Sequence, residues 1–125
     1  MLNLWRPALR AAAVCLLLSL PMPAHASEGR VSWYGPEHGQ ARHRTACGER
    51  FRPDAVLAAH PSLPCGARVQ VTDLATGRSL VVPVRDRGPA RRLGRVLDLS
   101  RGAAVRLGMI RRGVIRARLT VLGDR

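Results

Sequence analysis

The chain has 125 residues and a net charge of +13, and all 21 of its basic residues are arginine. This length supports one small hydrophobic core, which excludes a multidomain architecture. The strong positive charge favours a polyanionic partner. Trp33, Tyr34 and Phe51 are the only aromatic residues beyond the first five positions. Because they are too few for a platform that stacks bases, we expect no nucleic-acid partner.

The first 26 residues have the pattern of a secretory signal. Arg6 and Arg10 precede an apolar stretch over residues 11–20, and Ala24-His25-Ala26 is a small-x-small cleavage site. The apolar stretch is about half of the ~20 residues that a membrane-spanning helix needs. We therefore expect a signal peptide at 1–26 and one domain at 27–125, exported to the periplasm or cell envelope or secreted. Removing two arginines leaves 19 against eight acids, so the exported domain carries about +11.

Two cysteines, Cys47 and Cys65, remain after this cleavage. In an oxidising compartment such a pair predicts one disulfide, which would stabilise the fold by about 3 kcal/mol. Zinc is the alternative for paired cysteines. Neither cysteine lies in a C-x-x-C motif and only His60 is near them, so we expect no metal site.

Alternating apolar and polar residues predict short strands along the rest of the chain. They are expected at residues 30–34, 67–74, 78–86, 96–99 and 114–122, with a hairpin between the second and third. Residues 37–52 predict a long polar loop and 54–59 a short helical turn. Ser100 is a natural N-cap for a helix over 101–107 that ends at Gly108. Five or six strands with one helix predict a mainly β fold, a small closed barrel.

The strand expected at 78–86 ends in a carboxylate. Apolar residues at positions 80, 82 and 84 share one face with Asp86, because side chains alternate along a strand. Burial should disfavour the charged carboxylate, while Arg85 and Arg87 beside it favour that form. This competition is typical of a catalytic acid. The alternative is a structural aspartate that caps the following turn.

Motifs along nearly the whole of residues 27–125 resemble the rare lipoprotein A family. They are Ser32-Trp33-Tyr34-Gly35, Thr45-Ala46-Cys47-Gly48-Glu49, Ala58-Ala59-His60, Leu63-Pro64-Cys65-Gly66, Gly77-Arg78-Ser79, Asp86-Arg87-Gly88-Pro89, Asp98-Leu99-Ser100, and Ala103-Ala104 with Leu107-Gly108-Met109. The resemblance implies a six-stranded double-psi β-barrel without a cofactor. It also implies lytic transglycosylase activity, which cuts the MurNAc-GlcNAc bond of peptidoglycan and leaves an anhydro-MurNAc end. Expansins carry a related barrel, so a non-catalytic module that binds or loosens wall glycan is the alternative.

The resemblance assigns three catalytic residues. Asp86 is the acid and base, and Glu49 and His60 are the other groups expected at the site. Their side chains are of the acid, base and hydrogen-bonding types that glycosidic chemistry requires. Glu49 could instead pair with a neighbouring arginine on the surface. His60, which precedes a proline, could hold a turn by bonding to the backbone.

Four further residues are predicted to contact substrate. Trp33 and Tyr34 are adjacent in one strand, so one is expected in the core and the other against a sugar ring. Arg85 replaces an asparagine common in relatives, and Arg87 is expected to meet substrate carboxylates or to steady Asp86. A processed lipoprotein cysteine and a C-terminal glycan-binding module have no counterpart in the sequence. We therefore expect a monomer without a stable membrane anchor, which binds peptidoglycan strands through the barrel and its charge.

Overall fold

The computed structural model describes residues 26–35, 44–89 and 94–123. The elements are β1 (Ala26–Tyr34), β2 (Ala58–Ala59), β3 (Arg68–Asp73), β4 (Ser79–Asp86), β5 (Arg95–Ser100), α1 (Arg101–Leu107) and β6 (Val114–Gly123). The prediction of a mainly β fold with six strands and one short helix is therefore confirmed.

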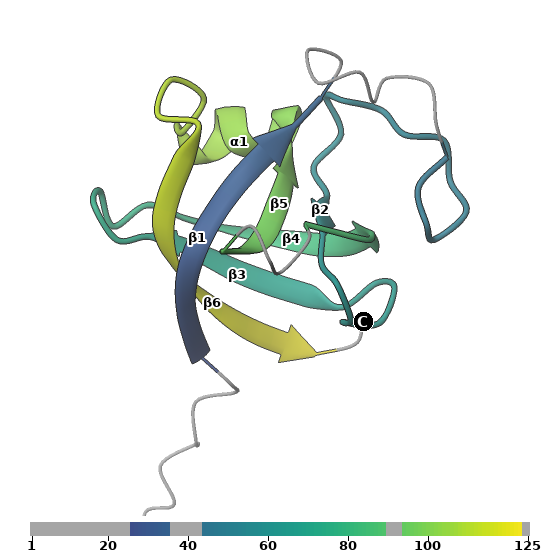
Figure 1. Cartoon of the computed structure of the whole chain (residues 1–125), viewed down its shortest axis with the longest axis horizontal. Coiled ribbons are helices and arrows are strands. Elements are labelled where there is room, and N and C mark those ends of the chain that lie inside the picture. The colour runs from purple at the N-terminus through teal and green to yellow at the C-terminus, as the bar shows by residue number, and fades with distance from the viewer. Residues whose placement is uncertain (1–25, 36–43, 90–93, 124–125) are drawn as a thin grey trace, which may run out of the picture.

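The strands close into a barrel in the order β1-β5-β2-β4-β3-β6 (Figure 1). Two pairs, β1 with β5 and β2 with β4, are parallel, and the other four pairs are antiparallel. Closure gives each of the six described strands two neighbours, so their backbone groups pair within the barrel. The helix α1 packs at one end, against β4 and β5.

Apolar side chains at alternate strand positions fill the barrel, as the sequence pattern predicts. The larger buried aliphatic residues of the strands are Val31, Val69, Val71, Val82, Val84, Leu97, Leu99, Ile115 and Leu119. Ala103, Ala104 and Leu107 of α1 complete the same core. Each larger side chain contributes about 1.5 to 3 kcal/mol by leaving water. This core fixes the strand ends at which the candidate site lies.

The ends of α1 confirm the predicted caps. The Ser100 hydroxyl oxygen accepts from the backbone N–H of Ala103 at 3.2 Å, and Gly108 ends the helix with a left-handed φ of 77°. The same hydroxyl donates to the Ala55 carbonyl at 2.5 Å and accepts from the Leu57 N–H at 3.2 Å. One side chain thus ties α1 to the segment that leads into β2.

The segment 54–59 differs from the predicted helical turn. A turn does form at its start, where the N–H of Ala55 donates to the carbonyl of Arg52. Its end is extended, however, and Ala58–Ala59 forms β2 between β4 and β5. The helical prediction is wrong there because pairing with two strands outweighs the high intrinsic helix propensity of alanine, which tertiary contacts readily override.

The strand β1 is longer than the predicted segment 30–34. It begins at Ala26 because its first part pairs antiparallel with β6, starting with Ala26 opposite Thr120. Its second part pairs parallel with β5. The predicted signal lies outside the described residues except for Ala26. Residues 37–43 of the predicted loop lie outside them too. Within the described ranges, no helix has the length and apolar character needed to cross a membrane.

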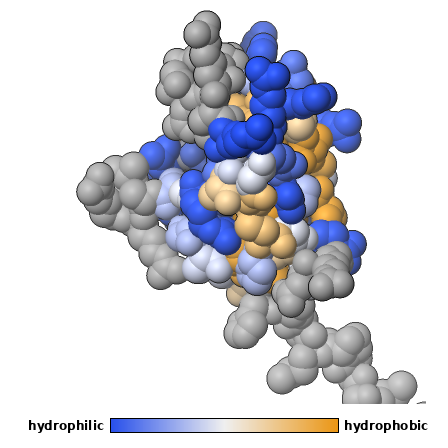
Figure 2. All heavy atoms as spheres, turned by 90° about the vertical axis from the view of Figure 1, so that its right-hand side faces the viewer, coloured by the Kyte–Doolittle hydropathy of each residue, from blue (hydrophilic) through white to orange (hydrophobic). Residues whose placement is uncertain are grey.

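The outer face of the barrel carries many arginines. Exposed arginines on the strands include Arg30, Arg68, Arg116 and Arg118. Figure 2 shows one face of the molecule, on which strongly hydrophilic residues lie beside a hydrophobic area that reaches the right-hand edge of the view. The exposed arginines are consistent with the expected polyanionic partner, which stays a prediction.

Candidate functional site

Asp86 lies at the C-terminal end of β4, on the barrel rim. It shares a face with Val82 and Val84, which are fully buried, and is itself 8% exposed. The predicted apolar row that ends in an acid is therefore confirmed. Ala59 of β2 lies opposite Asp86 in the neighbouring strand.

At least three hydrogen-bond donors hold the Asp86 carboxylate. Its Oδ1 accepts from the backbone N–H groups of Ala46 and Arg87, both at 2.9 Å. Its Oδ2 accepts from the Tyr34 hydroxyl at 3.2 Å. A backbone N–H can only donate, whereas a tyrosine hydroxyl can also accept. Oδ2 is therefore the oxygen that can carry a proton.

Tyr34 supports Asp86 from a small apolar cluster beneath it. Its ring is 4% exposed and stacks on Phe51, with the centroids 5.0 Å apart and the planes at 16°. Burial first, and then the charge of Asp86, raise the pKa of Tyr34 well above its usual value, so the hydroxyl stays protonated. Because the residue is covered, only the Tyr34 hydroxyl is placed where a substrate could contact it, and the predicted contact stays a prediction. Trp33, on the opposite face of β1, is partly buried and packs against the main core.

A pocket of about 220 Å³ opens beside Asp86. Its lining consists of Tyr34, Ala59, Asp86, Arg87, Gly88, Pro89, Arg95 and Asp98. The pocket contains a carboxylate from each of two strands, Asp86 from β4 and Asp98 from β5. The arrangement can therefore supply both a proton donor and a negative charge to a bound sugar.

Asp98 has no role assigned from the sequence alone. Its Oδ1 accepts from the Ser32 hydroxyl at 2.6 Å, and Arg95 Nη1 donates to the oxygen of that hydroxyl at 3.1 Å. Asp98 begins the family-like motif Asp98-Leu99-Ser100. That motif is the sequence signal that could have identified Asp98 as a site residue. Its proximity to Asp86, however, depends on the insertion of β2 between β4 and β5.

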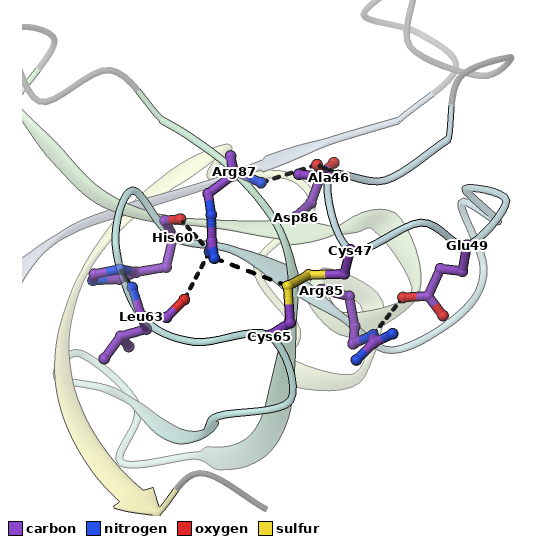
Figure 3. Close-up of a disulfide and its surroundings, with 9 residues drawn as sticks. All are labelled: Ala46, Cys47, Glu49, His60, Leu63, Cys65, Arg85, Asp86 and Arg87. Atoms are coloured by element: carbon purple, nitrogen blue, oxygen red, sulfur yellow. Dashed lines mark hydrogen bonds and ion pairs between the residues drawn. A yellow bond between two sulfur atoms is a disulfide. The ribbon is translucent and has the colours of Figure 1, made fainter.

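Glu49 lies outside the lining of this pocket. Arg85 Nε donates to its Oε1 at 2.5 Å, with both side chains about one-third or more exposed, at 32% and 43%. Figure 3 shows the Glu49 carboxylate turned toward Arg85 and away from Asp86. The structure thus brings these two predicted site residues together as a surface ion pair, which was the alternative interpretation of Glu49.

His60 supports the site chiefly through its backbone and the following turn. Its Nδ1 accepts from the N–H groups of Ser62 and Leu63, at 3.1 and 3.0 Å. Its own N–H donates to the Asp86 carbonyl at 3.1 Å. The residue lines a neighbouring pocket of about 410 Å³, which Arg95 also lines. This geometry matches the turn-holding alternative.

Arg87 joins Asp86 to the loop after β2. Its guanidinium donates to the carbonyls of Leu63, at 2.7 Å, and His60, at 3.3 Å. Its backbone N–H bonds to Asp86, as described above. Arg87 therefore steadies the acid, and it also lines the pocket, where a substrate carboxylate would meet its charge.

The disulfide between Cys47 and Cys65 is confirmed, with an S–S distance of 1.97 Å. It links two loops that flank Asp86 (Figure 3). One of these loops supplies the Ala46 donor to the acid. Bonded to each other, the sulfurs are not zinc ligands. Within the described residues, no group of three or more His, Cys, Asp or Glu side chains is placed to hold a metal ion.

Sequence comparisons show what the chain is similar to. Residues 26–119 match the family model described as "Lytic transglycolase". The chain is 56% identical over 96 residues to a probable endolytic peptidoglycan transglycosylase RlpA of Nostoc sp., covering 77% of this chain and 26% of that protein. It is 42% identical over 98 residues to the endolytic peptidoglycan transglycosylase RlpA of Campylobacter jejuni, covering 78% and 34%. The chain therefore spans about a quarter to a third of the length of these curated relatives.

Solved structures of similar shape support the barrel. The Streptomyces papain inhibitor aligns with a TM-score of 0.65 at 24% identity, covering 81% of this chain and 97% of that one. The Clavibacter michiganensis expansin aligns with a TM-score of 0.61 at 25% identity, covering 81% and 52%. At such identities the similarity concerns the fold.

Proposed function

Because the chain belongs to the lytic transglycosylase family of double-psi β-barrel domains, we propose that it cleaves the MurNAc-GlcNAc bond of peptidoglycan strands and leaves anhydro-MurNAc ends. One observation carries the proposal. Asp86, nearly buried and held by three donors, faces a pocket on the barrel rim. A carboxyl group in such a setting has a fixed position and restricted access to water, which suits proton transfer to a bound glycan.

In the proposed reaction, one carboxyl group serves both half-steps. Asp86 Oδ2 gives its proton to the glycosidic oxygen, and the electron pair of the breaking C–O bond moves onto that oxygen. The 6-hydroxyl of the muramic acid then bonds to the anomeric carbon and returns a proton to the Asp86 carboxylate. Asp86 is regenerated, and the reaction consumes no water.

Other residues position the acid during this cycle. The Tyr34 hydroxyl can accept a hydrogen bond while Oδ2 is protonated and donate one when Oδ2 is ionised. Ala46 and Arg87 keep Oδ1 in place in both states. Glu49, His60 and Arg85 were predicted at the site, and we propose that they shape the surrounding loops.

The substrate class also suggests where the chain acts. Peptidoglycan lies outside the cytoplasm, so the proposal requires export, which the signal predicted at 1–26 would provide. The arginine-rich surface would draw the domain toward the anionic envelope. We propose that residues 27–125 act there as a monomer.

A non-catalytic wall-binding module is the second candidate. It is favoured by the fold similarity to an expansin and by the placement of Glu49 outside the pocket. In that case the same rim would hold glycan without proton transfer.

Digestion of purified peptidoglycan, followed by mass spectrometry of the released muropeptides, distinguishes these possibilities. We expect anhydro-MurNAc ends from the wild-type protein and a large loss of product from Asp86→Asn. Detection of reducing ends in place of anhydro-MurNAc ends would show that the reaction is hydrolysis. Glycan binding without any product would favour the non-catalytic module.

A further inference from the structure

We propose that Asp98 is a second catalytic carboxylate of this site, which faces Asp86 across Ala59 and is positioned by Ser32. The inference rests on the proposed cleavage of a glycosidic bond. Neither the sequence motifs nor the names of relatives assign Asp98 this role.

Strand register places the two carboxylates on opposite sides of one small residue. Ala59 of β2 lies opposite Asp86 of β4 on one side and opposite Asp98 of β5 on the other. All three residues line the pocket. Two strand spacings separate the acids, roughly 9 to 10 Å between Cα atoms. The methyl group of Ala59 leaves the space between them open.

Asp98 is held by groups on rigid strands. Ser32 lies opposite Asp98 in β1, is 3% exposed, and donates its hydroxyl proton at 2.6 Å. Arg95, which begins β5 and lines the pocket, donates in turn to the Ser32 oxygen. Because Ser32 accepts from a cation, its own proton is directed toward Asp98. Ser32 is thus a positioning residue for this carboxylate.

Two carboxylates that line one pocket can bracket a sugar bond between them. Glycosidases commonly place two carboxyl groups about 5 to 9.5 Å apart across the scissile bond. As Asp86 protonates the leaving oxygen, positive charge develops at the anomeric carbon. A carboxylate on the other wall of the pocket stabilises that charge without a proton transfer of its own. Glu49 is the sequence-predicted candidate for a second acid, but it contacts Arg85 and does not line the pocket.

The test compares Asp98→Asn with Asp54→Asn in the full exported protein. Asp54 is the matched control, because its side chain is 90% exposed and lies 3.9 Å from Arg101. For Asp98→Asn we expect kcat on peptidoglycan to fall ~10²-fold, as when one charge-stabilising group is removed from an active site, with KM little changed. Asp54→Asn should keep the wild-type rate. Wild-type kcat in a folded Asp98→Asn protein would overturn the proposal.

A second variant covers the case in which Asp98→Asn does not fold. Ser32→Ala keeps both carboxylates and removes only the positioning hydroxyl. We expect about a 10-fold fall in kcat, an altered pH profile of kcat and an unchanged KM, because Asp98 loses one charge-assisted hydrogen bond. An unchanged kcat and pH profile would contradict the role of Asp98.

Binding separates this proposal from the proposed function if the wild-type protein does not cut. The probe is a GlcNAc-MurNAc tetrasaccharide, added while the side-chain carboxyl carbons are followed by NMR. Shifts of both the Asp86 and Asp98 signals, with the Glu49 signal unchanged, would support a glycan site formed by both aspartates. In that case only the proposed cleavage reaction would be refuted. A shift of Asp86 without one of Asp98 would refute the pair.

Discussion

The β3-β4 hairpin places two buried aspartates at opposite ends of the barrel, and the sequence around them is alike. Asp73 ends β3 and Asp86 ends β4, each after alternating apolar residues. Asp73 is fully buried, pairs with the Arg112 guanidinium and accepts from the Ala75 N–H at 3.0 Å. Asp86 instead accepts from two backbone amides and a tyrosine hydroxyl, and faces a pocket.

This difference shows what separates a structural acid from a candidate catalytic one on the same scaffold. The alternating pattern buries both carboxylates. At Asp73 a side-chain cation and a local turn enclose the acid. At Asp86 the surrounding loops hold the carboxylate and leave space beside it for substrate. Function therefore depends on the loops at that rim, whereas the strand pattern alone serves either role.

Replacing Asp86 by Asn should separate the two acids most clearly. The shape of the side chain is kept and its exchangeable proton is lost, so we expect cleavage to fall ~10²-fold or more, on the order of 3 kcal/mol in the barrier. The rate of anhydro-muropeptide release measures the loss, and thermal unfolding should change little. Undiminished cleavage would refute the assignment of Asp86 as the acid.

Removing the disulfide tests whether the Asp86 end depends on its cross-link. Replacing Cys47 and Cys65 together by Ser should lower the free energy of unfolding by about 3 kcal/mol, since the closed loop no longer restricts the unfolded chain. Denaturant unfolding with and without a dithiol provides the measurement. The wild-type protein should respond to the reductant, and the double variant should not. Equal midpoints for the wild-type protein and the double variant in the absence of the dithiol would show that the cross-link contributes nothing.

Asp73→Asn should affect stability and leave the chemistry intact. We expect a loss of about 2 kcal/mol, less than the ~3 to 5 for a fully buried pair, because Arg112 remains in contact with water. The pKa of Asp73 is lowered, chiefly by the hydrogen bond from Arg112. The stabilisation that ionised Asp73 contributes is therefore fully present above the unfolded pKa of about 3.9, and it is lost as the pH falls through the lower folded pKa.

Acid unfolding of the same variant sharpens this prediction. The wild-type free energy of unfolding should decline below about pH 4, and Asp73→Asn should decline less steeply over that range. Asp86→Asn serves as the comparison at the other rim. If the free energy of unfolding of Asp73→Asn fell with pH as steeply as that of the wild-type protein, the Asp73–Arg112 ion pair would not account for the acid sensitivity.

Glu49→Gln should have the smallest effect. Its exposed pair with Arg85 is screened by solvent, so we expect a stability change below about 1 kcal/mol. Cleavage should fall less than in Asp86→Asn. A comparable loss of cleavage would restore Glu49 as a catalytic partner.

The sequence predicted those parts of the fold that local chemistry determines. Alternation identified β3, β4 and β6, and Ser100 and Gly108 marked the ends of α1. Alternation did not reveal β2, because two consecutive alanines show no alternation of apolar and polar residues. They form a strand only because they lie between β4 and β5. The site followed the same division: Asp86 was visible as the end of an apolar row, whereas its neighbour Asp98 depends on the register that β2 sets. The pairing of Glu49 with Arg85 also joins distant segments and was only one of two alternatives.

The hydrogen bonds around the pocket have a consequence for folding kinetics. They join residues 40 positions apart for Ala46 and Asp86, 52 for Tyr34 and Asp86, and 66 for Ser32 and Asp98. Contacts of such separation form only after long loops close, and domains dominated by them fold in about milliseconds to seconds. We therefore expect the two acids to meet late, when the barrel is nearly complete. A newly synthesised chain would carry its full positive charge from the start but acquire the pocket only at the last stage of folding.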